Sequence, residues 1–170
     1  GSVIRGRSGR CTGKWKRNGS DSRRIRGYAE SVYRQCYVEE AEEYAGFSPM
    51  AELSQVLGFS VPEVKNIPFE VTSTVYTNGW NEFAQVEYQG KSQDEAVLFR
   101  KARGTDDISG DYNTYSDVKE VTVKEVSVTL KGDDGQYKLA IWQQDGFAYS
   151  LNYEPGGSQA VFVEMIQSVQ

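Results

Sequence analysis

The N-terminal third of the chain carries apolar residues at helical spacing. They recur at intervals of three and four residues, at Ile25, Tyr28, Val32 and Cys36. This spacing predicts a helix over 23–45, which Gly46 would end. A second, shorter helix is predicted over 49–57, with Gly58 as its end.

After Pro62 the period changes to two, which is typical of strands with one face buried. Turn residues separate the runs at Asn78-Gly79, Lys124-Glu125, 132–135 and Asp145-Gly146. The alternating runs lie at 67–75, 80–88, 96–101, 121–123, 126–130, 137–141 and 147–153.

The last predicted element is a helix that starts after Ser158, a residue suited to the N-cap. Its inward positions would be Val161, Met165, Ile166 and Val169. The fold class predicted is therefore α+β: an antiparallel meander sheet of about six or seven strands, with N-terminal helices and one C-terminal helix packed on it.

Charge divides the chain into two parts. Residues 1–27 hold nine Lys/Arg against one acid, a net charge of +8, whereas the remainder holds ten basic and 23 acidic residues, a net of −13. We expect 1–27 to be a basic flexible tail, in which Gly1-Ser2 resembles the remnant of a cleaved tag, and 28–170 to be a single α+β domain. The alternative is a tail that contacts phosphate or headgroups, but only Trp15 there offers stacking, so the case for nucleic acid is not strong.

Composition excludes several chemistries. Histidine is absent, which removes a Ser-His-Asp triad, a Cys-His pair and any His-ligated zinc. The two cysteines, Cys11 and Cys36, allow one bridge at most and are more typical of bystanders. No apolar run approaches the roughly 20 residues of a membrane helix. We expect no cofactor and no catalytic residue set.

Three aromatic residues are the candidate ligand-binding positions. Trp142, Tyr76 and Phe83 each alternate with apolar neighbours, so the predicted sheet is apolar on both faces. A second apolar face needs a cover, which is a helix in the simplest interpretation. A groove for a ligand or peptide is the alternative that gives these residues a function.

The segment 106–113 gathers oxygen-bearing side chains. Three aspartates, Asp106, Asp107 and Asp111, lie close to a serine and an asparagine, a set that suits Ca²⁺. The spacing does not match an EF-hand, and side chains of this kind also cap their own backbone. We therefore expect no metal there and interpret the segment as an Asx-rich connection.

The most specific motifs are residues 107–113, Asp-Ile-Ser-Gly-Asp-Tyr-Asn, and residues 129–132, Thr-Leu-Lys-Gly. With them, the chain from about Glu39 to its end resembles domain-of-unknown-function family 4367. The resemblance implies a small bacterial domain, extracytoplasmic or accessory and sensory. That family has no catalytic residue set to carry over.

The functional prediction is a non-catalytic binding or sensory module that holds an unidentified ligand or protein partner on its sheet. The first alternative is a structural domain that associates through an open sheet edge, as a monomer or weak dimer. The second is an enzyme based on Asp106, Asp107 or Asp111, with or without a metal.

Overall fold

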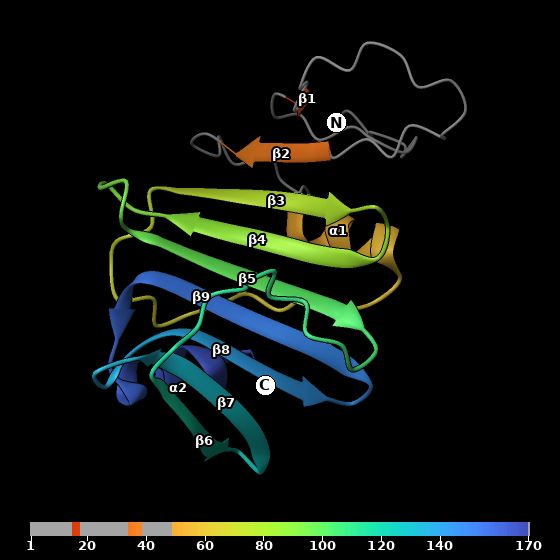
Figure 1. Cartoon of the computed structure of the whole chain (residues 1–170). Helices are drawn as coiled ribbons and strands as arrows, with labels where there is room; N and C mark the ends of the chain where they lie inside the picture. The colour runs from red at the N-terminus through yellow and green to blue at the C-terminus, as the bar shows by residue number, and fades with distance from the viewer. Residues whose placement is uncertain (1–14, 18–33, 39–48, 170) are drawn as a thin grey trace, which may run out of the picture.

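The computed structural model describes residues 15–17, 34–38 and 49–169, and its strands form one antiparallel sheet (Figure 1). The sheet has nine strands in the order β1-β2-β3-β4-β5-β9-β8-β7-β6. Their bounds are β1 Trp15–Arg17, β2 Arg34–Val38, β3 Ser73–Gly79, β4 Phe83–Gln89, β5 Ala96–Arg103, β6 Asp117–Val123, β7 Val126–Asp133, β8 Gln136–Gln144 and β9 Phe147–Gly157.

The α+β prediction is confirmed. Seven antiparallel strands follow one another between Ser73 and Gly157, and two helices of the described chain, α1 (Pro49–Leu57) and α2 (Gln159–Ser168), lie before and after them. Both helices lie behind the sheet in the view of Figure 1. Ser158 occupies the N-cap position of α2 as predicted, but its side chain makes no capping hydrogen bond.

The sheet is not one simple meander. Strands β3 to β5 form one meander and β6 to β9 form another, and β9 joins them by pairing with β5 on one side and β8 on the other. The chain must therefore pass from β5 to the far edge of the sheet. It does so through residues 104–116, here called the strap, which cross in front of the sheet on the face opposite the helices (Figure 1).

The predicted helix over 23–45 is wrong at residues 34–38, where the structure has β2. This strand pairs with β3, with Cys36 opposite Tyr76. Hydrogen bonds to the edge of β3 override a helical preference that the local spacing alone supports. The rest of that helix lies outside the described residues. So does the predicted tail 1–27, except β1, which pairs with β2.

The first hairpin turns later than predicted. Gly79 ends β3 opposite Phe83, and the three turn residues are Trp80, Asn81 and Glu82, the first two with φ of 51° and 63°. Asn78 Oδ1 accepts a hydrogen bond from the Asn81 N–H at 2.9 Å, which fixes the turn. The predicted turns at 124–125, 132–135 and 145–146 are confirmed, with positive φ in each.

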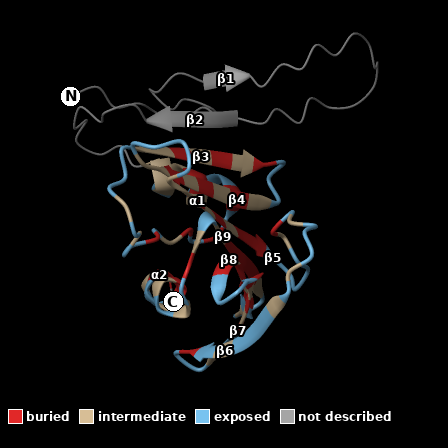
Figure 2. Ribbon diagram, turned by 60° about the vertical axis from the view of Figure 1, so that its left-hand side comes forward, coloured by how far each residue is buried: buried red, intermediate tan, exposed pale blue. Residues whose placement is uncertain are grey.

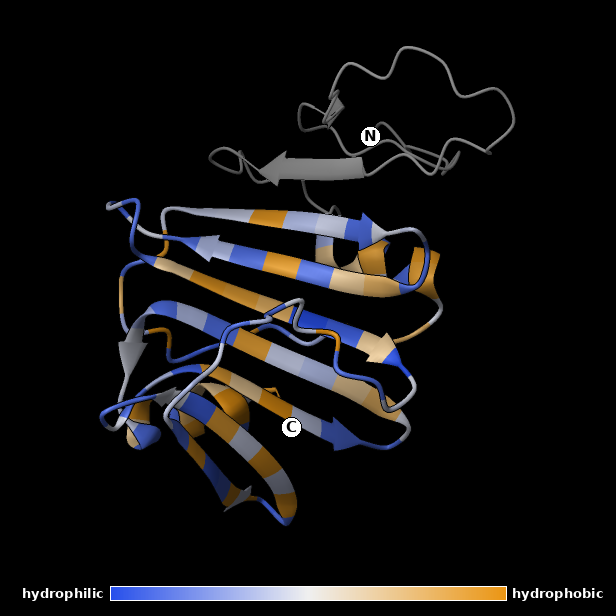
Figure 3. Cartoon of the chain, in the orientation of Figure 1, coloured by the Kyte–Doolittle hydropathy of each residue, from blue (hydrophilic) through white to orange (hydrophobic). Residues whose placement is uncertain are grey.

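The core fills the space between the sheet and the helices. Buried residues alternate along the strands, as the bands of Figure 3 and the red segments of Figure 2 show. From the sheet, the largest fully buried residues on this face are Phe99, Leu130 and Leu151, and α2 adds Phe162 and Met165. The face toward the strap is more polar, and this difference places the candidate site.

Candidate functional site

The structure does not bring the three predicted aromatic residues together. Trp142 and Tyr76 point to the helix side of the sheet, since Trp142 pairs with Val128 and Tyr76 with Val86. Phe83 lies on the strap side, where the Arg100 guanidinium sits 5.5 Å from its ring centroid. Of the three, Trp142 alone lines the groove described next.

A groove opens where β7 and β8 separate. The two strands are paired from Val128↔Trp142 to the hairpin that joins them. At the other end, beyond Val128 and Trp142, they diverge (Figure 1). The opening, of about 600 Å³, is here called the splayed groove. It is lined by Thr105, Asp106, Asp107, Glu120, Glu125, Val126, Ser127, Thr129, Ile141, Trp142, Gln143, Gln144 and Tyr149. Because β7 and β8 separate here, residues from both faces of the sheet line the same groove.

The splayed groove is acidic. Asp106 and Asp107 come from the strap and Glu120 and Glu125 from the β6–β7 hairpin, and all four are exposed. No Lys or Arg is among the lining residues. Lys131 Nζ lies 3.9 Å from Asp107 Oδ2, a long contact between partly exposed groups. Within the described residues, most of this negative charge therefore has no ion-pair partner.

Trp142 forms the buried side of the groove. It is 4% exposed, and its ring stacks on Tyr149 with centroids 5.1 Å apart and planes 3° from parallel. Its Nε1–H is buried and has no hydrogen-bond partner among the described residues. An indole N–H buried in this way normally finds an acceptor. Trp142 thus lines the groove and carries a buried N–H that has no acceptor among the described residues.

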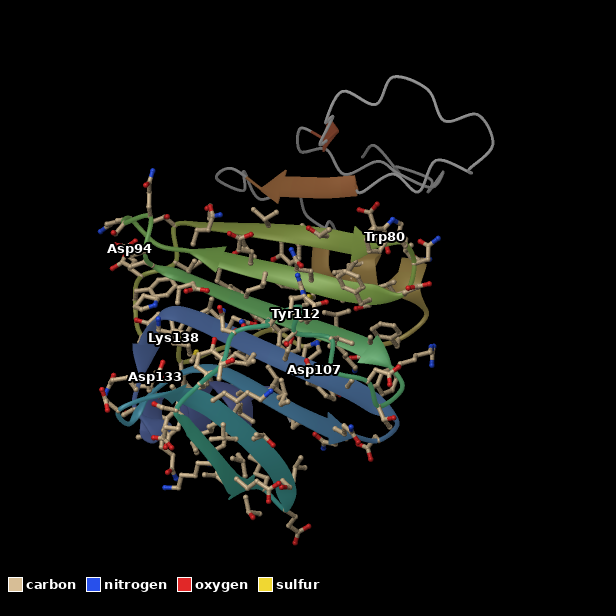
Figure 4. The ribbon with its side chains drawn as sticks, viewed as in Figure 1. Trp80, Asp94, Asp107, Tyr112, Asp133 and Lys138 are labelled. Carbon is tan, nitrogen blue, oxygen red and sulfur yellow. The ribbon has the colours of Figure 1, made fainter. Side chains whose placement is uncertain are left out.

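The strap that carries Asp106 and Asp107 is tied to the sheet. Arg100 Nη1 donates to the carbonyl oxygens of Ile108 and Ser109 at 3.0 and 2.7 Å. Gln143 Nε2 donates to the Thr105 carbonyl at 2.5 Å. At the far end, the Ser116 N–H donates to Asp133 Oδ1 at 2.8 Å. Figure 4 shows Asp107 and Tyr112 of the strap in front of the sheet. These ties hold the acidic wall of the groove in place.

The aspartates of the strap cap their own backbone. Asp107 Oδ1 accepts from the Ser109 N–H at 2.9 Å, and Asp111 Oδ1 accepts from the Asn113 N–H at 2.8 Å. Asp111 Oδ2 accepts from the Tyr115 hydroxyl at 2.5 Å. Burial opposes ionisation of Asp111, but these hydrogen bonds outweigh it, and its pKa lies below the ordinary value. Within the described residues, no three His, Cys, Asp or Glu side chains form a metal-binding group.

A buried lysine lies on the helix side of the sheet, outside the groove. Lys101 is 7% exposed, and its Nζ donates to the Ser60 carbonyl at 2.6 Å. The same Nζ lies 4.3 Å from the ring centroid of Phe147 and 5.4 Å from that of Tyr149. Burial, with the nearby Arg103, lowers the pKa of Lys101. Sequence reasoning missed this contact, which fastens the loop after α1 to β5.

Stability is expected to fall as the pH rises above 10. Burial raises the pKa of Tyr88, and burial with the Asp111 hydrogen bond raises that of Tyr115 to about 12. Between pH 10 and 12 the unfolded tyrosines lose protons that the folded ones keep, so unfolding is favoured. Lys101, with its lowered pKa, acts in the opposite direction. Urea unfolding from neutral pH to pH 12 measures the slope, and Tyr115→Phe should reduce it; an unchanged slope in that variant would contradict the assignment.

The chain matches no family model, no curated protein and no solved structure. The resemblance to domain-of-unknown-function family 4367 therefore stays a prediction. In the described part of the chain, neither helix has the length and apolar character needed to cross a membrane.

Proposed function

We propose that this chain is a non-catalytic binding module whose splayed groove takes a cationic ligand. The observation that carries the proposal is that four exposed carboxylates, those of Asp106, Asp107, Glu120 and Glu125, line one groove that has no Lys or Arg in its lining. A ligand with positive charge compensates the carboxylates, and a complementary charge also speeds its encounter with the groove.

The exposure of the carboxylates favours binding over catalysis. General acid–base work needs carboxyl groups in a desolvated site that shifts their pKa toward neutrality. The carboxylates of Asp106, Glu120 and Glu125 are instead exposed to solvent. Charged groups of this kind attract a ligand and fix its position.

The alternative, association through a sheet edge, has weaker support. β6 is the terminal strand of the sheet next to β7, and its Val118 is 59% exposed. The same strand also carries Asp117, Lys119 and Glu120. Charged residues on an edge strand disfavour pairing with another sheet.

The proposal is tested with spermine, a polycation, by isothermal titration calorimetry on the full chain. The triple variant Asp106→Asn, Glu120→Gln, Glu125→Gln should weaken binding at least tenfold and lower its dependence on salt, because three of the four carboxylates are neutralised. Asp107 is kept, since it caps Ser109.

The matched control neutralises three exposed carboxylates that do not line the groove, Glu82→Gln, Asp94→Asn and Glu154→Gln. Figure 4 shows Asp94 at the upper left edge of the sheet and Asp107 in front of its middle. The control should bind spermine almost as the parent does. An equal loss in both variants, or no binding by the parent, would refute the proposal.

A further inference from the structure

We infer that the ligand of the splayed groove is an extended peptide segment rich in lysine and arginine. This inference rests on the proposed function and names its ligand class. Three features of the groove support it: the placement of its charges, the unsatisfied donor at its buried side, and the divergence of the two strands that bound it.

The charges stand on two separate walls. Asp106 and Asp107 belong to the strap, whereas Glu120 lies in β6 and Glu125 in the turn that follows it. The strap is joined to the sheet by Arg100 and Gln143, so its wall is fixed independently of the hairpin. A ligand that compensates both walls needs several cations along its length, as a Lys/Arg-rich segment has.

The buried donor requires an acceptor that many cations lack. The Trp142 Nε1–H has no partner in the described part of the chain, and a metal ion or a polyamine offers it none. A peptide brings a carbonyl oxygen at every residue. The ligand class that satisfies both the carboxylates and the indole is therefore a cationic peptide.

The shape of the groove suits an extended backbone. β7 and β8 are paired up to Val128↔Trp142, beyond which Ser127 and Gln143 line opposite sides of the opening. Each diverging strand keeps its partner on the far side, since Ser127 pairs with Thr122 and Gln143 with Ala148. An added segment between them follows the way in which extended peptides join open strands.

The experiment compares two probes on the full chain by calorimetry: a peptide of alternating arginine and serine, and spermine, which has no carbonyl. Trp142→Phe keeps an aromatic ring against Tyr149 and removes the N–H. We expect this variant to weaken peptide binding by about five- to tenfold, the effect of one hydrogen bond to a buried donor. Spermine binding should fall by a smaller factor, because spermine has no acceptor for the N–H.

A second measurement does not depend on the variant. In the parent chain labelled with ¹⁵N, the indole N–H resonance of Trp142 should shift when the peptide is added and stay in place with spermine. Resonances of the other two tryptophans, Trp15 and Trp80, serve as internal references.

The outcomes separate the two proposals. If spermine binds but the peptide binds no tighter, or if the Trp142 resonance does not respond to the peptide, the inference about peptides is overturned and the cation-binding function stands. If neither probe binds, both proposals fail. Peptide binding that is equally strong in the acidic triple variant would place the peptide elsewhere and overturn the inference.

Discussion

Replacing Trp142 by alanine is expected to lower the free energy of unfolding by about 3–5 kcal/mol. The side chain is 4% exposed, stacks on Tyr149 and belongs to the main hydrophobic core. Alanine removes the indole and leaves a cavity beside Tyr149 in the core that the packed neighbours fill only in part. Urea unfolding followed by far-UV circular dichroism measures the change.

Trp142→Phe is the control for this substitution. It retains an aromatic ring and removes the unsatisfied donor, so its cost should be well below that of alanine. A loss near zero for alanine would show that Trp142 is not part of the core. The comparison matters for function, because a loss of binding in the alanine variant cannot be separated from a loss of folding.

Replacing Gly132 by alanine is expected to cost about 3 kcal/mol or more. A Cβ built at this position lies 2.1 Å from the Gln136 carbonyl oxygen and 2.5 Å from Tyr137 Cα. Both are backbone atoms that cannot move without breaking the β7–β8 ladder. The register of this ladder shifts between Lys131 and Gly132, which brings the strands this close.

Gly135→Ala is the matched control in the same hairpin. A Cβ there has no atom within 4 Å, although the φ of +73° disfavours alanine. The cost should be about 1 kcal/mol, from the backbone conformation alone. If the two variants unfold at the same urea concentration, the close contact at Gly132 does not exist as described.

Most of the sheet could be predicted from local sequence patterns, because a half-buried strand shows alternating apolar residues and a tight turn shows characteristic turn residues. Three of the turns carry the Gly, Asp or Lys-Glu pairs that were expected, and the alternation of Leu139, Ile141 and their neighbours placed the later strands. The strand β2 was missed because its partner, β3, lies far along the chain. No local sequence pattern indicates that β9 lies between β5 and β8 either.

The site was predicted only in part. The alternation of apolar residues in its strand points to Trp142, and the predicted hairpin also indicates its partner: with Asp145-Gly146 as the turn, Trp142 faces Tyr149. Tyr76 and Phe83 were chosen by the same rule but lie away from the groove. The acidic walls depend on the strap and on the divergence of β7 from β8, which only the assembled fold defines.

The central position of β9 has a consequence for synthesis of the chain. Strands β3–β5 and β6–β8 are synthesised before β9, so the edges of β5 and β8 that β9 later joins have no partner until residues 147–157 have been made. Because the sheet closes only when residues 147–157 are complete, early termination leaves two unjoined halves with exposed apolar faces. Until β9 forms, these open edges and apolar faces are sites at which the incomplete chain can aggregate.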